Sequence, residues 1–135
     1  MSSKPLEFVE TAKRILSVAQ GESDFRAAAS RAYYGALHEA DLVTPTQFAA
    51  SASDRRSESS HRAILGGLQG WGNSLVAGRT EARQIERILK RMKARRQDAD
   101  YELDTSFESD VALDVIEQAE KVLQYAAEAI RKASG

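Results

Sequence analysis

Hydrophobic residues recur three and four positions apart along most of the chain, a spacing typical of amphipathic helices. The clearest stretch runs from Ile85 to Tyr101. Its inward positions, continued past its end, are Ile85, Ile88, Leu89, Met92, Ala99 and Leu103. The same spacing puts Arg96 on the inward line, four residues after Met92. Because a guanidinium keeps its charge, we expect Arg96 to pair with a carboxylate, face a cleft or bind an anion.

Asp100 lies one helical turn beyond Arg96, on the same side of this predicted helix. Tyr101 follows it directly. We therefore take Arg96, Asp100 and Tyr101 as the predicted centre of function.

The pattern predicts four further helices. They are expected over Pro5–Ala19, from Ser23 or Asp24 to about Val43, from His61 to about Leu68, and from about Val111 to Lys132. The long helix is expected to be capped by Thr80.

Two stretches between the helices lack the pattern. Thr44–Glu58 has no period and predicts a mobile loop. Five glycines around Trp71 predict irregular structure from Gln69 to Gly78. With no repeat or domain boundary, the sequence predicts one all-α domain over residues 1–135. Its expected form is an up-and-down bundle of four long helices and one short helix.

Composition narrows the chemistry. The chain has 135 residues, 42% hydrophobic and 29% charged, with a net charge of −1. It has no cysteine, which excludes disulfides and thiolate chemistry, and two histidines are too few to predict a zinc site. No signal sequence or membrane-spanning run is visible. We expect a cytoplasmic protein with no metal, cofactor or membrane association.

Positive charge is concentrated between Arg79 and Arg96. Eight basic and two acidic residues lie there, a local balance of 8 − 2 = +6, so the rest of the chain carries −7. One-turn steps join the members of a basic stripe: Arg79, Arg83, Arg87 and Lys90. Together with Arg95, the stripe is a candidate phosphate-binding surface. The alternative is a solvated face paired with acids of the last helix, Glu117, Glu120 and Glu128.

The second predicted helix carries a polar face with Ser30, Arg31, Tyr34 and His38. Tyr34 and His38 are one turn apart, so both can reach the same place. His38 is either a hydrogen-bonded structural residue or a proton-transfer group. Of the two adjacent tyrosines at 33 and 34, we expect packing, with one hydroxyl bonded at the edge of the core.

Three segments resemble motifs of the HEPN family, small all-helical domains of prokaryotic defence and toxin–antitoxin systems. Residues 30–38 (SRAYYGALH) resemble its SRAYY…H helix, and residues 96–101 (RQDADY) resemble the R-x-x-A-D-Y ending of a later helix. Ser60 and His61 resemble the S-H pair that opens a short helix between them. The order and spacing agree over roughly residues 6 to 130.

The resemblance implies a bundle of four or five helices and a homodimer in which two arginine motifs share a cleft. Many members are metal-independent ribonucleases, in which an arginine holds the phosphate. A histidine that follows the arginine acts as base or acid. This chain departs from that pattern, because no histidine follows His61.

Three hypotheses follow. In the first, the protein is a ribonuclease: Arg96 holds the phosphate, Tyr101 bonds to it, and His38 or His61 replaces the missing histidine. In the second, it is a non-catalytic module that binds RNA, a nucleotide or a protein. A small nucleotidyltransferase, for which Tyr101 would be an acceptor, is then an expected partner. In the third, Arg96 and Asp100 form a structural ion pair in a dimer. We favour a defence or toxin–antitoxin component.

Overall fold

The structure, a computed structural model, describes residues 5–51, 60–101 and 109–134; for residues 22, 96–101 and 109–110 it describes the backbone only. Every regular element in these ranges is a helix, which confirms the all-α prediction. The helices are α1 (Pro5–Ser17), α2 (Glu22–Val43), α4 (Ser60–Gly72), α5 (Arg79–Tyr101) and α6 (Ser109–Ser134). None of them is long and apolar enough to cross a membrane.

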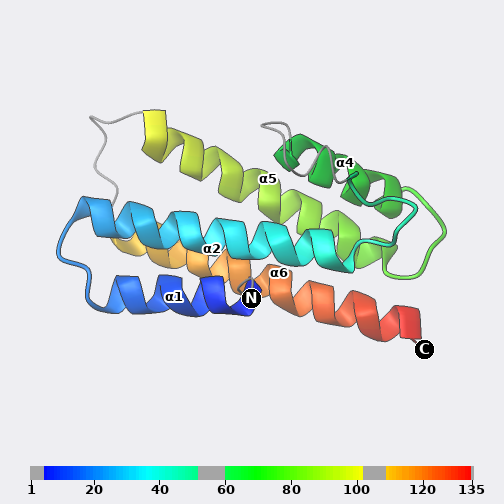
Figure 1. The fold of residues 1–135 in the computed structure, drawn as a ribbon, viewed down its shortest axis with the longest axis horizontal. Helices are drawn as coiled ribbons and strands as arrows, with labels where there is room; N and C mark the ends of the chain where they lie inside the picture. Colours follow the sequence, from blue (N-terminus) through cyan, green and yellow to red (C-terminus); the bar gives the residue numbers. More distant parts are fainter. Residues whose placement is uncertain (1–4, 52–59, 102–108, 135) are drawn as a thin grey trace.

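Four helices alternate in direction, as the sequence predicts for an up-and-down bundle. Figure 1 shows α1, α2, α5 and α6 running back and forth, with α4 added on the side of α5 and α2. Helix α2 lies at the centre and contacts all four other helices. Residues 44–59 separate α2 from α4 in the sequence, and α4 lines both pockets described below.

Small residues let α2 occupy the centre. Its seam of alanines is buried: Ala28, Ala29, Ala32, Ala36 and Ala40. At Gly35 the approach of α1 is closer still, because an added Cβ would lie 2.8 Å from Cβ of Phe8 and 2.9 Å from the carbonyl oxygen of Pro5. The inward face predicted for α5 is confirmed as far as Met92, since Ile85, Ile88, Leu89 and Met92 are buried. The side chains of Ala99 and Leu103, its other predicted members, lie outside the described residues. Burial of such side chains is the main stabilising term, about 1.5–3 kcal/mol for each large one.

Two predicted helix starts are wrong. Helix α2 begins at Glu22 with Gly21 as its N-cap, and the Gly21 carbonyl accepts hydrogen bonds from the N–H groups of Asp24 and Phe25. The Asp24 carboxylate, one of the two predicted caps, accepts instead from the N–H of Gln20 at 3.0 Å, before the start of α2. Helix α5 begins at Arg79 rather than after Thr80.

The predicted end of the short helix is also wrong. Instead of stopping near Leu68, α4 continues to Gly72 through Gly67 and Gly70. An isolated helix would lose about 1 kcal/mol at each glycine. Here the missing side chains let Phe48 approach: an added Cβ would lie 2.4 Å from the Phe48 carbonyl at Gly67 and 3.4 Å from its ring at Gly70. Tertiary packing therefore outweighs local propensity.

The predicted loop over residues 44–58 is described only as far as residue 51. Within that part, the chain makes a hydrogen-bonded turn: the N–H of Phe48 donates to the Pro45 carbonyl at 2.9 Å. Phe48 is half-buried and packs against the core. The remainder of the predicted loop lies outside the described residues.

Candidate functional site

A pocket of about 280 Å³ lies between α2 and α4, and we call it the α2–α4 pocket. Helix α2 contributes Tyr34, Leu37, His38 and Asp41, and α4 contributes Ser60, His61 and Ile64. The prediction that Tyr34 and His38 reach the same place is thus confirmed. His61 joins them because α4 packs against α2. Both histidines of the chain therefore line one pocket.

Tyr33 fixes the orientation of His61. Its side chain is fully buried, and its hydroxyl lies 3.0 Å from Nδ1 of His61. The two rings also stack, with centroids 5.4 Å apart, while Tyr34 meets the His61 ring edge-on at 5.8 Å. The sequence expectation of one tyrosine hydroxyl bonded at the edge of the core is confirmed.

His38 sits at a more open position than His61. Its exposed ring stacks on Phe8 of α1, with centroids 5.7 Å apart. The Arg31 guanidinium lies over the same Phe8 ring at 5.9 Å. Arg31 and Ser30 do not line the α2–α4 pocket. The polar face predicted for this helix is therefore divided between α4 and α1.

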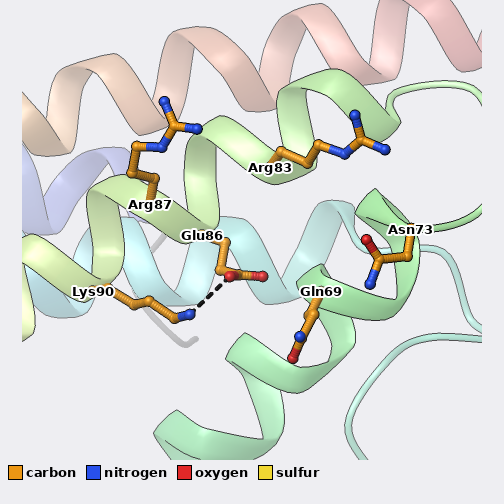
Figure 2. Close-up of a pocket in the computed structure, with 6 residues that line it drawn as sticks. All are labelled: Gln69, Asn73, Arg83, Glu86, Arg87 and Lys90. Atoms are coloured by element: carbon orange, nitrogen blue, oxygen red, sulfur yellow. Dashed lines mark ion pairs between the residues drawn. The ribbon is translucent and has the colours of Figure 1, made fainter.

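A second pocket, of about 350 Å³, lies between α4 and α5, and we call it the basic groove. Gln69 and Asn73 on α4 line it together with four residues of α5: Arg83, Glu86, Arg87 and Lys90. In Figure 2, Glu86 and Lys90 lie on the side of α5 nearer α4, and the Arg87 side chain extends away from Gln69 and Asn73. Three members of the predicted stripe therefore share one groove. Their charges and that of Glu86 give a local balance of 3 − 1 = +2.

The three cations of the groove differ in their partners. Nζ of Lys90 lies 2.9 Å from the Glu86 carboxylate (Figure 2), and Nε of Arg83 donates to the Gly72 carbonyl at 2.7 Å. Arg87 is exposed, and no residue that the structure describes forms a hydrogen bond or ion pair with it. A guanidinium without a carboxylate partner keeps its five donors for a ligand.

The other predicted phosphate ligands lie outside the groove lining. Arg79 reaches the Ser74 carbonyl at 3.4 Å, and Arg95 pairs with Asp114 of α6 at 3.4 Å. The acids proposed as alternative partners of the stripe are used elsewhere: Glu120 pairs with Lys13, and Glu128 with Arg131. Glu117 is exposed. Among the described residues, the expected pairing of the stripe with Glu117, Glu120 and Glu128 is therefore not found, while the exposure of Arg87 fits both a solvated face and a phosphate-binding surface.

The predicted centre of function stays a prediction. The backbone of α5 is helical to Tyr101, which agrees with the spacing that put Arg96 four residues after the buried Met92. The side chains of Arg96, Asp100 and Tyr101 lie outside the described residues, and so does any contact between Arg96 and the two histidines.

Seven lining residues were not among the predicted site residues: the apolar Leu37 and Ile64 and the polar Asp41, Ser60, Gln69, Asn73 and Glu86. A signal existed for Asp41, which follows His38 at helical spacing. None existed for Gln69 and Asn73, because glycine content predicted irregular structure there. Among the described residues, no three histidines, aspartates or glutamates are grouped as metal ligands would be.

No protein-family model, curated protein or solved structure matches this chain. The resemblance to the HEPN family therefore remains a prediction from three short motifs.

Proposed function

We propose that this protein binds single-stranded RNA through the basic groove, as a HEPN-like component of a prokaryotic defence or toxin–antitoxin system. The observation that carries the proposal is Arg87, an exposed guanidinium without a partner among the described residues. It lies between Arg83 and Lys90 along α5. The HEPN resemblance supports RNA as the polyanion and supports the biological setting.

The groove has the two kinds of group that a nucleic-acid backbone requires. Cations on α5 neutralise phosphates, and each contact releases condensed counterions. The amides of Gln69 and Asn73 on α4 can bond to phosphate and sugar oxygens without regard to sequence. The net charge of the whole chain is −1, so binding has to be local to the groove.

Salt-dependent binding of labelled oligouridine, followed by fluorescence polarisation, tests the proposal. Three phosphate contacts predict that log K falls with log salt with a slope of about −2, since each contact contributes about −0.7 on a single strand. Arg87→Ala should reduce the slope by about 0.7 and weaken binding. The matched control is Lys121→Ala, which removes an exposed cation of α6 that lines neither pocket. Equal effects of the two substitutions would contradict the proposal.

A second candidate, metal-independent cleavage of RNA, is supported by one observation. Both histidines line the α2–α4 pocket, and Tyr33 holds one of them in place. In this reading Arg96 holds the scissile phosphate and His38 or His61 moves protons. Cleavage of RNA in the presence of a chelator, lost in Arg96→Ala and in His61→Ala, is the expected result. Cleavage that requires magnesium would exclude the mechanism.

A further inference from the structure

The α2–α4 pocket differs in chemistry from the basic groove, although both border α4. The basic groove lies on the flank of α4 that faces α5 and is lined by charged groups and amides. The α2–α4 pocket lies on the flank that faces α2, and two apolar side chains line it, Leu37 at 3% and Ile64 at 6% exposure. Phosphates suit the first surface. The second suits a flat, uncharged ring, since ligand pockets combine apolar lining with a few polar groups.

The walls of this pocket are aromatic. Tyr34 and His61 are both half-buried and meet at nearly a right angle, with an interplanar angle of 80°. The His61 ring is held from behind by Tyr33, through stacking and the 3.0 Å contact. Because single-stranded RNA is recognised by splaying bases onto such rings, a pair of fixed aromatic walls favours a nucleobase.

The size of the pocket admits one base. Its volume of about 280 Å³ is at the lower limit of ordinary ligand sites, which span about 300–1,000 Å³. A stacked dinucleotide does not fit such a space, whereas a single ring system at the end of a flexible strand does.

The polar groups of the pocket then select the base. Asp41 and Ser60 line it together with the rings. A carboxylate only accepts hydrogen bonds, so it matches an edge with two adjacent N–H donors. Guanine has such an edge, at N1 and N2. Adenine and cytosine place an acceptor next to their amine, and uracil places acceptors on both sides of its single N–H. Each of these brings a lone pair against the second carboxylate oxygen.

We infer that the α2–α4 pocket receives one unstacked guanine base, with the Tyr34 ring as its stacking surface and Asp41 as the group that selects guanine. The His61 ring stands nearly perpendicular to Tyr34 and meets the base edge-on. This inference rests on the proposed function, because RNA held in the basic groove supplies the base. Asp41 also interacts within the chain. A carboxylate has about four acceptor positions, so it keeps that partner and accepts from the base as well.

The histidines supply a direct test, because the chain has only two and both line the pocket. In a proton NMR titration with guanosine 5′-monophosphate, both imidazole signals should shift and saturate. Inosine 5′-monophosphate keeps N1–H and the phosphate but lacks the 2-amino group, and it should bind about 5- to 100-fold more weakly. Asp41→Asn should abolish that difference. Imidazole signals that do not move with guanosine monophosphate would overturn the inference.

A second measurement separates this inference from the proposed function. Polarisation assays compare an oligouridine with the same oligomer carrying one central guanosine. The wild type should prefer the guanosine oligomer, and Asp41→Asn should lose the preference while keeping its affinity for oligouridine. Arg87→Ala should weaken the binding of both oligomers by the same factor, so that the preference for the guanosine oligomer is kept. The oligomer should also bind more tightly than guanosine monophosphate, which identifies RNA rather than free nucleotide as the natural source of the base.

The possible failures are distinguishable. If guanosine monophosphate shifts both imidazole signals but no oligomer binds, the proposed RNA binding is wrong, and the inference that the pocket binds guanine is retained. If oligouridine binds and a central guanosine adds no affinity, the inference about guanine is wrong, and the proposal of RNA binding in the basic groove is retained.

Tyr34→Phe keeps the stacking ring and Tyr34→Ala removes it. Only Tyr34→Ala should weaken the binding of guanosine monophosphate, by about 5- to 100-fold. The far-ultraviolet circular dichroism of both variants should be unchanged.

Discussion

Replacement of Gly78 by alanine tests the packing that holds α4 against α5. Gly78 lies between the two helices, and its carbonyl accepts the Ala82 N–H at 2.9 Å in the first turn of α5. Its φ of 91° is in the left-handed region that side chains disfavour. An added Cβ would lie 2.6 Å from Cζ2 of Trp71 and 3.2 Å from Cβ of Ala129 on α6.

The expected loss of stability has two parts. The backbone conformation costs an alanine about 1–2 kcal/mol. The contact with Trp71 adds about 1–3 kcal/mol as overpacking, because that ring is only 2% exposed and is tied to the Ala77 carbonyl by its N–H at 3.1 Å. The sum, about 2–5 kcal/mol, corresponds to a lower Tm by about 8–20 °C for a chain of this size.

Urea denaturation followed by circular dichroism measures the effect, with Gly66→Ala as the control. Gly66 is inside α4, and an added Cβ there meets nothing within 4 Å. That substitution should stabilise by about 0.5–1 kcal/mol. In a Trp71→Phe background Cζ2 is gone, so Gly78→Ala should cost about 1–2 kcal/mol less than in the wild type. A loss below about 1 kcal/mol in the wild type, or no coupling to Trp71, would refute this reasoning.

Two further predictions concern carboxyl groups, the buried Glu81 and the half-buried Glu39. Glu81 has a side chain only 8% exposed and pairs with Lys132 at 2.7 Å, and its Oε1 has no hydrogen-bond partner among the residues that the structure describes. Lys132→Ala should therefore destabilise by about 1–3 kcal/mol in urea denaturation, against under 0.5 kcal/mol for Lys121→Ala. Burial raises the pKa of Glu39 above its ordinary value of 4.5; the folded state then holds this proton more tightly, so stability falls as pH rises through that region. Glu39→Gln should stabilise the protein at neutral pH and give no gain below about pH 4; a gain that is independent of pH would contradict this cause.

The spacing of hydrophobic residues was sufficient to predict the helices and their inward faces. In α5 the apolar positions recur every three or four residues, and those from Ile85 to Met92 are buried in the structure. Helix ends were less predictable, since they depend on contacts from distant segments. Gly67 lowers helix propensity whether or not Phe48 approaches it, so the sequence pattern ended α4 too early.

The pockets were predictable only in part, for a similar reason. Tyr34 and His38 share a helix, so their spacing alone brings them together. His61 joins them through packing of α4 on α2, which spacing does not report. Partners of charged residues were the least predictable feature. Arg95 pairs with Asp114, although Glu117, Glu120 and Glu128 of the last helix were the expected partners of the basic residues.

The position of α4 should control both pockets at once, because each takes one wall from this helix. At Gly67 an added Cβ would lie 2.4 Å from the Phe48 carbonyl oxygen, closer than real contacts allow. A backbone atom moves less readily than the end of a side chain, so we expect Gly67→Ala to displace α4. The variant should lose affinity for oligouridine and for guanosine monophosphate together. Its matched control, Gly66→Ala, should retain both. Unchanged binding in Gly67→Ala would show that residues 44–51 move aside instead, and that α4 is held in place mainly by α5.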